Sequence, residues 1–383
     1  MTQQSSADFL IIGAGAAGLS VARELCEVAS VIVLEREHTP GYHATSRSAA
    51  IFVDSYGDEV IQRLTAASRP LLDTPPFAVD SELLPRRRGL LHVARTTSLA
   101  LSATDSRAQL PVLTRDEARA LVPILRETAI AYAHWEEGAT DIDVHALLTG
   151  LQRHIKMRGG RILPAAPVMA ARRAAGIWTL TAGASTVSAP IVINAAGAWA
   201  SEVGRLLGAR DLPLIPFRRT AATLAPPDGV DISAWPMVVD LEESVYFKPD
   251  AGVFMLSPAD ETPVAAHDAY ADDLDVAIAV DRFENLTDCS VRRVLAKWAG
   301  LRTMAPDRRP VIGFDSEVEG LFWLAGQGGF GIQTALGAAA LSRNLIGAGG
   351  TPNETFAGLA PLLSPARLSA QGVNRYVRAS ASC

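Results

Sequence analysis

A glycine-rich turn near the start of the chain constrains the fold more than any other segment. The apolar run from Phe9 to Ile12 ends in Gly13-Ala14-Gly15-Ala16-Ala17-Gly18. A helical pattern follows to about Cys26, and a second apolar run, Val31 to Leu34, stops at the acid Glu35. This order predicts a strand, a tight turn, a helix and a second strand with a carboxylate at its tip, the arrangement that binds dinucleotides.

Each glycine of this turn has an expected task. Gly13 allows the tight turn, Gly15 lets backbone N–H groups approach a pyrophosphate, and Gly18 lets the helix pack close to the strand. The helix N-terminus offers unpaired donors to phosphate oxygens, and Glu35 is expected to accept the hydrogen bonds of a ribose. A glycine turn without a ligand is the alternative, but it leaves an acid at this spacing unexplained.

The composition limits the classes of protein that remain. The chain has 383 residues, enough for two domains or one large α/β unit. Its hydrophobic fraction of 49% and charged fraction of 20% are typical of a soluble globular protein. A net charge of −6 argues against a nucleic-acid partner. The short basic clusters at 86–88, 172–173 and 218–219 are interpreted as solvated surface patches.

The cysteines and the uncharged segments suggest no metal site and no membrane span. Cys26, Cys289 and Cys383 lack metal-ligand or CxxC spacing, so no metal is expected. The polar N-terminus lacks a secretory pattern, which favours a cytoplasmic protein or one peripheral to the inner membrane. Two long segments, 174–201 and 320–342, carry no charge. Glycines and polar residues interrupt both, so the first predicts strands and the second a loop rather than transmembrane helices.

The pattern along the chain predicts a discontinuous nucleotide domain in an α/β fold of mixed type. Strands are expected at 191–194, 253–257 and 321–325, and helices at 16–26, 145–158 and 335–346. A second glycine cluster, Gly326 to Gly331, is expected beside the first in space. We therefore predict a Rossmann-like domain interleaved with a substrate domain on a mixed β-sheet. The former takes residues 1–83, 146–212 and 298–383, and the latter takes 84–145 and 213–297.

Four further segments favour a flavin over a nicotinamide. Residues 41–50, rich in small and hydroxyl side chains, follow the second strand, and residues 192–199 run from a strand into a small-residue turn. A Trp-Ala-Gly-Leu-Arg segment at 298–302 leads into 306–313. The glycines at 326–331 precede a helix and offer a second helix N-terminus to an anion.

These segments resemble the D-amino-acid oxidase superfamily of flavoproteins, which includes glycine oxidase, sarcosine oxidase and D-amino-acid dehydrogenases. Within it, the sequence is most similar to bacterial FAD-dependent D-arginine dehydrogenases. The shared strings are LEREHTPGYHATSRSAA, LTAASR, VINAAGAWA, WPMVVDLEESVYFKPDAG, WAGLR and QGGFGIQT. The resemblance implies bound FAD and a substrate domain whose mixed sheet lies over the flavin.

The resemblance also implies which residues contact FAD. It places the pyrophosphate at the first glycine turn, the adenosine ribose at Glu35 and Arg36, the adenine at Val168 and the isoalloxazine edge near Gly329. The expected cofactor residues are Gly13, Gly15, Ala16, Ala17, Gly18, Glu35, Arg36, Arg47, Ser48, Ala49, Val168, Ala196, Gly197, Trp199, Gly300, Gly329, Gly331, Ile332 and Gln333.

Four residues are expected at the substrate by the same resemblance. Arg302 is implied as a forked clamp for a carboxylate, and Arg219 as a second guanidinium near the same group. Tyr246 is implied to meet the carboxylate through its hydroxyl, and Tyr56 to lie on a loop that closes over the substrate. The alternatives are a surface salt bridge for Arg302, a surface position for Tyr56 and a merely half-buried strand tyrosine for Tyr246.

The substrate pocket departs from the D-arginine enzymes. Gly89 stands where they carry a glutamate that pairs with the substrate guanidinium, and Arg88 beside it would repel a cation. Ile51 replaces a further histidine. With Val53, Met237 and Val239 also expected in the pocket, a neutral, apolar or small D-amino acid is favoured over D-arginine or D-lysine. An acidic side chain met by Arg86 or Arg88 is a further alternative.

The expected function is oxidative deamination of a D-amino acid to a 2-oxo acid and ammonia through an imino acid. Oxidation of a secondary amine or a 2-hydroxy acid by the same site is the first alternative. A flavoprotein that binds FAD without turnover is the second. The sequence leaves the electron acceptor open among a quinone, a dye and oxygen.

Overall fold

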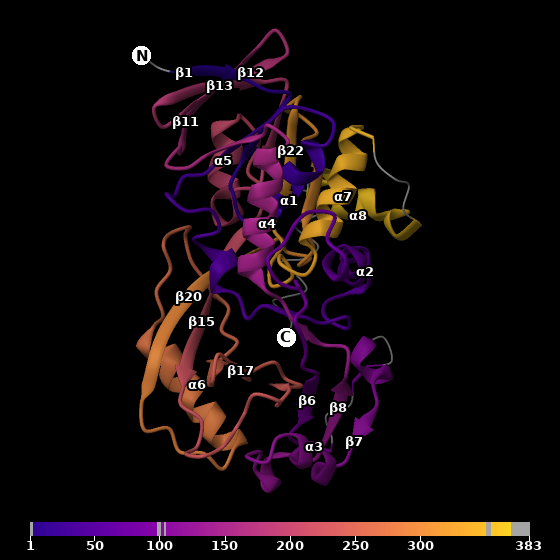
Figure 1. The fold of residues 1–383 in the computed structure, drawn as a ribbon, viewed down its shortest axis with the longest axis vertical. Coiled ribbons are helices and arrows are strands. Elements are labelled where there is room, and N and C mark those ends of the chain that lie inside the picture. Colours follow the sequence, from indigo (N-terminus) through magenta and orange to yellow (C-terminus); the bar gives the residue numbers. More distant parts are fainter. Residues whose placement is uncertain (1–2, 98–100, 103–104, 350–353, 369–383) are drawn as a thin grey trace.

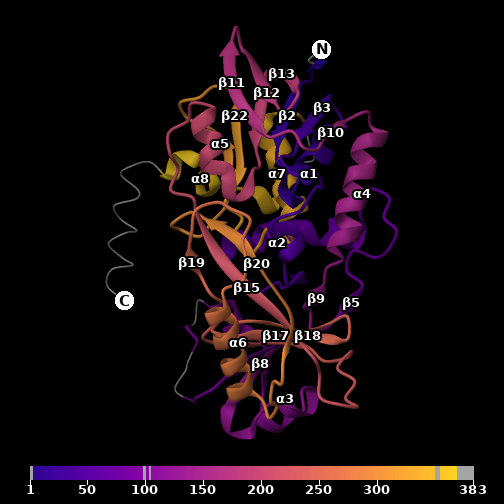
Figure 2. The same ribbon diagram turned by 90° about the vertical axis from the view of Figure 1, so that its left-hand side faces the viewer.

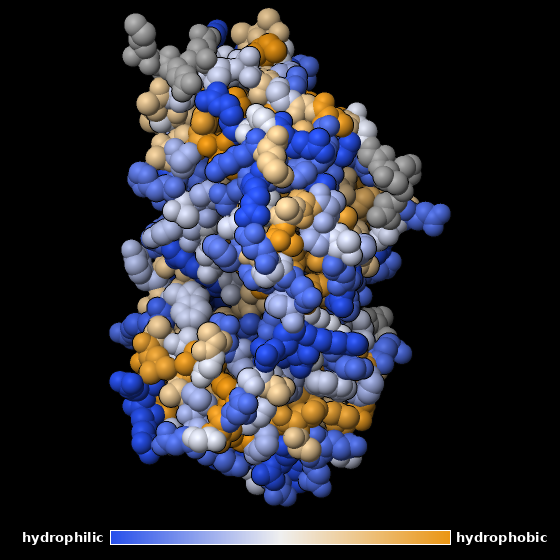
Figure 3. All heavy atoms as spheres, in the orientation of Figure 1, coloured by the Kyte–Doolittle hydropathy of each residue, from blue (hydrophilic) through white to orange (hydrophobic). Residues whose placement is uncertain are grey.

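A computed structural model describes residues 3–97, 101–102, 105–349 and 354–368. It is an elongated molecule with a six-stranded sheet toward one end and a nine-stranded sheet toward the other (Figures 1 and 2). The face in Figure 3 is largely hydrophilic, with apolar side chains in scattered patches. The helices are α1 (Ala16–Leu25), α2 (Glu59–Asp73), α3 (Arg115–Leu121), α4 (Val144–Met157), α5 (Ala200–Leu206), α6 (Asp273–Leu286), α7 (Ala335–Ile346) and α8 (Leu359–Leu363).

A six-stranded sheet forms the first end of the molecule. Its order is β10 (Arg161–Leu163), β3 (Val31–Leu34), β2 (Phe9–Ile12), β14 (Ile191–Asn194), β22 (Leu321–Ala325) and β21 (Val311–Phe314). Neighbours from β10 to β22 are parallel, and only β21 is antiparallel. Their buried apolar runs fit strands covered on both faces. Helices α1, α4 and α7 contribute to the core on one face.

A small four-stranded sheet and α5 cover the other face. The small sheet has the order β1 (Gln3–Ser6), β13 (Ser185–Ala189), β12 (Ile177–Ala182) and β11 (Val168–Ala174). The uncharged segment 174–201 therefore forms strands, as expected. Its counterpart, 320–342, holds β22 and the start of α7 around the expected loop. None of the helices in the described residues is long and apolar enough to cross a membrane.

A nine-stranded mixed sheet forms the other end. Its order is β19 (Thr262–Pro263), β15 (Ile215–Leu224), β18 (Val253–Ser257), β17 (Tyr246–Asp250), β16 (Met237–Asp240), β6 (Leu90–Ala94), β8 (Tyr132–Glu136) and β7 (Val112–Leu113), and β20 (Val294–Met304) also pairs with β15. Residues of α3 and α6 share an aromatic and aliphatic core with one face of this sheet. The short strands β4 (Ile51–Phe52), β9 (Thr140–Asp141) and β5 (Arg86–Arg87) form a separate three-stranded sheet.

The predicted mixed α/β fold is confirmed, and the five strands expected at 9–12, 31–34, 191–194, 253–257 and 321–325 have those bounds. The helix expected at 335–346 also has those bounds, the helix expected at 16–26 ends one residue earlier, and the helix expected at 145–158 lies one residue closer to the N-terminus at both ends. The interleaved domain division stays a prediction. Its boundary between residues 297 and 298 falls inside β20, because this long strand continues the larger sheet toward the nucleotide end.

Candidate functional site

Three adjoining cavities run from the six-stranded sheet to the nine-stranded sheet. The nucleotide cavity, about 400 Å³, lies at the glycine turn of β2. A junction cavity of about 140 Å³ shares Gly15, Arg47 and Gly300 with it. The substrate cavity, about 720 Å³, shares Ser48, Tyr246 and Arg302 with the junction cavity. The nucleotide and junction cavities together have the extended form that a dinucleotide needs, and the substrate cavity adjoins their end.

The glycine turn leaves no room for side chains beneath the nucleotide cavity. Gly13 has a φ of +104°, and a Cβ there would lie 2.4 Å from the Ala195 carbonyl oxygen. A Cβ on Gly18 would lie 1.9 Å from the Gly13 oxygen, so this glycine lets α1 pack against the turn. Gly15 caps α1 without a side-chain hydrogen bond, and the first turn of α1 contains no acid. The turn therefore presents backbone donors and a positive helix end to a phosphate, which fits FAD.

Glu35 is buried at the tip of β3 and lines the nucleotide cavity. One carboxylate oxygen accepts a hydrogen bond from the Ala14 N–H at 2.7 Å, and the other accepts one from the Glu37 N–H at 2.9 Å. Glu35 thus fixes the glycine turn itself, and its expected contact with a ribose stays a prediction. Arg36 lies over the Trp199 ring, with its Cζ 4.4 Å from the ring centroid. Val168, Ala196 and Gly197 also line this cavity.

The segment after β3 borders the junction cavity. Arg47 donates hydrogen bonds to the backbone oxygens of Ala269 and Ala299 and to the Asp268 carboxylate. Its guanidinium is therefore occupied by protein groups, and it ties this segment to β20. The expected cofactor residues Ala16, Ala17, Ser48, Ala49, Gly300, Gly329, Gly331 and Ile332 all line the junction cavity.

The second glycine cluster lies beside the first glycine turn, as the sequence predicts, because both line the junction cavity. A Cβ on Gly329 would lie 2.9 Å from the Tyr56 hydroxyl and 3.0 Å from Arg302 Nη1. This glycine therefore keeps the passage between the junction and substrate cavities open. Gln333 lines the substrate cavity instead and exchanges hydrogen bonds with the Val53 backbone.

One face of the nine-stranded sheet forms the wall of the substrate cavity. Side chains two residues apart on a strand share a face, so Leu90 and His92 on β6, and Met237 and Val239 on β16, all line it. Val239 pairs with Tyr246 in the register between β16 and β17. All four expected substrate residues, Arg302, Arg219, Tyr246 and Tyr56, line the same cavity.

Arg302 carries a positive charge at the junction of the two cavities. Its Nη1 donates to the Tyr56 hydroxyl at 3.4 Å. Among the described residues, no carboxylate lies within ion-pair range of Arg302, 4.0 Å. Burial lowers the pKa of this guanidinium, but Tyr56, Tyr246 and Glu261 outweigh that effect and hold it above its ordinary value. Arg302 therefore stays charged and is free to bind an anion.

Tyr246 and Arg219 flank this charge in different ways. Burial raises the pKa of the Tyr246 hydroxyl, but the charges of Arg302 and Arg219 outweigh burial and lower it overall. Arg219 donates to the Asp260 backbone oxygen at 2.8 Å and forms an ion pair with Glu261 at 3.0 Å. Its charge is therefore already partly neutralised, unlike that of Arg302.

The structure corrects one expectation about the substrate pocket. Ile51, Val53, Met237 and Val239 line the substrate cavity as expected, but Gly89 does not. A Cβ on Gly89 would lie 2.0 Å from the Trp135 ring, so this residue faces the opposite side of the sheet. Arg88 is buried in an ion pair with Asp141 and does not border the cavity either. Neither residue can therefore set the charge preference of the pocket.

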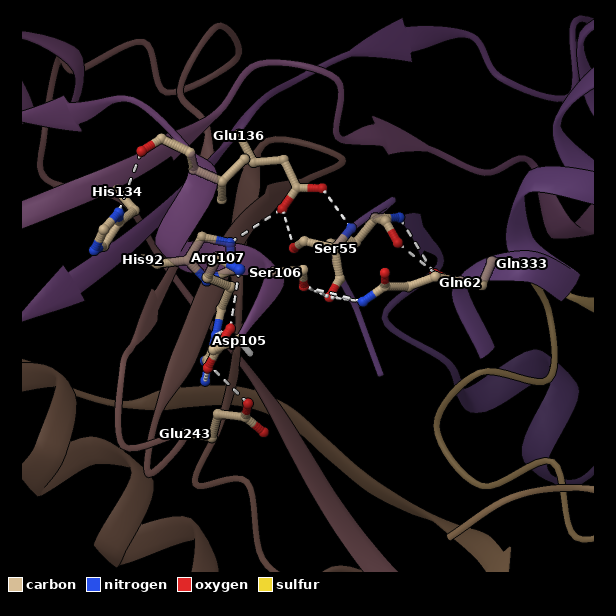
Figure 4. Close-up of polar contacts among 12 residues, drawn as sticks. Ser55, Gln62, His92, Asp105, Ser106, Arg107, His134, Glu136, Glu243 and Gln333 are labelled. Atoms are coloured by element: carbon tan, nitrogen blue, oxygen red, sulfur yellow. Dashed lines mark hydrogen bonds and ion pairs between the residues drawn. The ribbon is translucent and has the colours of Figure 1, made fainter. Parts of the chain in front are cut away.

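A polar group that the sequence analysis did not identify lines the far end of the substrate cavity. His92, Asp105, Arg107 and Glu243 belong to this end, and Glu136 lies directly behind it (Figure 4). Arg107 pairs with Asp105 at 2.7 Å and with Glu243 at 3.2 Å. These residues come from distant segments without any shared motif, so no sequence signal identifies them together.

Comparisons with known proteins agree with the nucleotide-to-substrate arrangement. The sequence matches the family model described as FAD dependent oxidoreductase over residues 8–345. Glycine oxidase of Geobacillus kaustophilus (strain HTA426) is 24% identical over an alignment of 344 residues that covers 83% of this chain and 87% of that enzyme. Mitochondrial dimethylglycine dehydrogenase of Mus musculus is 25% identical over an alignment of 284 residues that covers 68% of this chain and 32% of that protein. The chain thus spans only part of the length of this longer dehydrogenase.

Solved structures share the whole fold. L-proline dehydrogenase from P. horikoshii superposes with a TM-score of 0.80 at 20% identity and covers 96% of this chain and 98% of its own. Glycine oxidase from Geobacillus kaustophilus superposes with a TM-score of 0.78 at 23% identity and covers 95% of this chain and 99% of its own. At these identities the likeness establishes the fold.

Proposed function

The chain belongs to the family of FAD dependent oxidoreductases, and from this premise we propose that it deaminates D-amino acids oxidatively. The products are a 2-oxo acid and ammonia, formed through an imino acid. The coarser assignment, FAD-dependent oxidation of an amine or amino acid, follows from the family and its named relatives. The D configuration rests on the resemblance to D-amino-acid dehydrogenases.

The charge of Arg302 is the observation that carries this proposal. An uncompensated guanidinium in a partly buried site is unfavourable unless an anion binds to it. A substrate carboxylate placed on Arg302 would also meet the Tyr56 and Tyr246 hydroxyls, and Arg219 would add a second positive charge nearby. Carboxylate recognition by a forked guanidinium is bidentate, which fixes the orientation of the substrate Cα.

The residues of this chain bind and orient the substrate in this proposal. FAD, held by the residues that line the nucleotide and junction cavities, would supply the two-electron acceptor for the hydride that leaves the substrate Cα, and the amine would lose a proton to water to give the imino acid. Water then hydrolyses the imino acid to the 2-oxo acid and ammonia. Orientation by the clamp supplies part of the rate, since well-placed reactants can lower a barrier by roughly 7–11 kcal/mol.

The wall beyond the clamp supports a preference for neutral or apolar side chains over D-arginine. Leu90, Met237 and Val239 form the sheet surface next to Tyr246, and Ile51 and Val53 lie on the same cavity. The first carbons of a substrate side chain would therefore lie on apolar groups. This preference no longer depends on Gly89, which lies outside the cavity.

Oxidation of a secondary amine is the second candidate, because the matched relatives include a sarcosine dehydrogenase, and sarcosine is a secondary amine. A 2-hydroxy acid would use the same clamp. The electron acceptor in either case is a quinone, a dye or oxygen.

Anaerobic reduction of the purified flavoprotein tests the proposal. D-leucine, D-alanine, D-arginine, L-leucine, sarcosine and D-lactate are mixed with the protein, and loss of flavin absorbance is followed by stopped flow. Fast reduction by D-leucine with slow reduction by D-arginine and L-leucine is expected. Reduction by sarcosine or D-lactate alone would move the function to the second candidate, and reduction by none would contradict both.

A further inference from the structure

The turn that carries Tyr56 has two buried anchors. We call residues 53–57 the Tyr56 turn. On one side, the Gln333 side-chain oxygen accepts from the Val53 N–H, and the Gln333 side-chain nitrogen donates to the Val53 carbonyl oxygen. Both distances are 3.2 Å. On the other side, one Glu136 oxygen accepts from the Ser55 N–H at 3.0 Å, and the second accepts from the Ser55 hydroxyl. Figure 4 shows Glu136 and Gln333 on opposite sides of Ser55.

Glu136 is a buried acidic residue in the nine-stranded sheet. It is 4% exposed and lies at the end of β8. His92 approaches the oxygen that accepts from the Ser55 hydroxyl, with its Nε2 at 3.2 Å. Burial raises the pKa of the Glu136 carboxyl, but hydrogen bonds from His92 and Ser55 outweigh burial and lower it overall. A buried ionised carboxylate is costly unless hydrogen bonds such as these satisfy its oxygens.

The anchored residue is the immediate neighbour of Tyr56. Besides its contacts with Glu136, Ser55 accepts hydrogen bonds at its backbone oxygen from the Ser106 hydroxyl at 2.8 Å and the Gln62 amide at 3.2 Å. The N–H, carbonyl and hydroxyl of Ser55 are therefore all held. The next side chain reaches into the cavity, where the Tyr56 hydroxyl accepts from Arg302 Nη1.

We propose that Glu136, held by His92, is a positioning residue for carboxylate binding. Through Ser55 it fixes the backbone from which the Tyr56 hydroxyl meets Arg302, so that the clamp is assembled before the substrate arrives. This inference rests on the proposed function, because it assigns the Tyr56–Arg302 pair to the substrate carboxylate. Glu136 itself lies behind the cavity wall and does not touch the substrate.

Binding of a carboxylate that cannot react measures this role directly. 4-Methylpentanoate, which is leucine without its amine, is titrated into the FAD-loaded protein, and its Kd is read from the flavin absorbance. Glu136→Ala is expected to raise this Kd, and the KM for D-leucine, about tenfold. The reason is that Ser55 loses its anchor, so the Tyr56 hydroxyl is no longer held in place beside Arg302. The limiting rate of flavin reduction is expected to change much less. Glu136→Gln keeps an acceptor for the Ser55 N–H and is expected to restore most of the affinity.

A double-mutant cycle with Tyr56→Phe separates positioning from general stability. If Glu136 acts through the Tyr56 hydroxyl, Glu136→Ala raises the Kd far less in the Tyr56→Phe background, because the two changes remove one shared contribution. An equal rise in both backgrounds, or a lower Tm with an unchanged Kd, would overturn the inference. Ser55→Ala, which removes only the hydroxyl contact, is expected to raise the Kd about threefold and serves if Glu136→Ala does not fold.

His134→Gln is the matched control. His134 is buried on the same strand, two residues from Glu136, and approaches only the Leu110 backbone oxygen in the hydrogen bonds described for its side chain. Its replacement is expected to leave the Kd unchanged. Failure of every amine to reduce the wild-type flavin would reject the proposed reaction but not this inference, provided that 4-methylpentanoate binds. A wild-type protein that binds no carboxylate would overturn both.

Discussion

The nucleotide cavity and the substrate cavity are built in contrasting ways. Backbone atoms shape the nucleotide cavity. At both Gly13 and Gly18, a backbone oxygen lies so close that a side chain would clash with it. The substrate cavity is shaped by side chains such as Arg302, Tyr246 and Val239, which come from three different strands of one sheet. The nucleotide cavity therefore tolerates almost no added atom at these two glycines. In the substrate cavity, by contrast, a single substitution can change the binding preference without disturbing the backbone.

The largest expected effect is at the backbone site. Gly18→Val places new carbons where even a Cβ would lie 1.9 Å from the Gly13 oxygen, so α1 must move away from the turn. The purified variant is expected to lack bound FAD, measured by its visible absorbance, and to unfold at a lower temperature. Gly208→Asn is the control, because this glycine has open space and a φ of +81° that Asn accepts. Full FAD content in Gly18→Val would contradict the contrast.

The next effect is at the clamp. Arg302→Met removes the free positive charge and is expected to lower kcat/KM about a thousandfold, since loss of a partner of a buried ion contact costs 2–5 kcal/mol. Arg302→Lys keeps the charge but loses the fork, and we expect a fall of about tenfold. FAD content, measured on the same samples, is expected to stay near that of the wild type. A variant that loses FAD instead would show that the two sites are not separable.

An ion cluster beside the substrate cavity is expected to contribute to stability rather than catalysis. Asp141 on β9 pairs with Arg88 at 2.5 Å and with Lys248 on β17 at 3.2 Å. Burial raises the pKa of the Asp141 carboxyl, but Arg88 and Lys248 outweigh burial and lower it overall. The stabilisation is therefore present above the ordinary carboxyl pKa, and it is lost as the pH falls through the lower pKa of the folded state.

Asp141→Asn leaves two buried cations underpaired and is expected to reduce the free energy of unfolding by about 3 kcal/mol at pH 7. Urea denaturation measures the change, with the exposed Asp250→Asn as the control. The gap between the wild type and Asp141→Asn is expected to persist down to the ordinary carboxyl pKa, about 4, and to narrow as the pH falls below it. A gap that is constant with pH would assign the effect to packing instead of charge.

The smallest expected effect is on selectivity. Val239 lies on the cavity wall between Tyr246 and His92 in the sheet register. Val239→Glu adds a negative charge there and is expected to raise kcat/KM for D-arginine, relative to D-leucine, about tenfold, the value of a partly screened ion pair. Val239→Gln has the same length without the charge. An equal change in both variants would attribute the effect to size.

The sequence determined the parts of the protein that depend on neighbouring residues. The strand–turn–helix–strand unit and the strands β14 and β22 follow from local apolar runs and glycine spacing, and the bounds of these four strands of the six-stranded sheet are confirmed. The same holds for the glycine cluster after β22. Except for Gly18, which lets α1 pack against the turn, the residues expected to contact FAD line the three cavities, while their individual contacts stay predictions.

Only the tertiary structure decided which further residues line the substrate cavity and how their side chains are paired. Gly89 and Leu90 are adjacent in sequence, yet only Leu90 lines the cavity, because a strand turns successive residues to opposite faces. Glu136 meets Ser55 across 81 residues of sequence and His92 across 44. Arg219 forms an ion pair with Glu261, whereas no carboxylate of the described residues lies within ion-pair range of Arg302. Strand register and long-range pairing set all of these contacts, and neither leaves a local pattern in the chain.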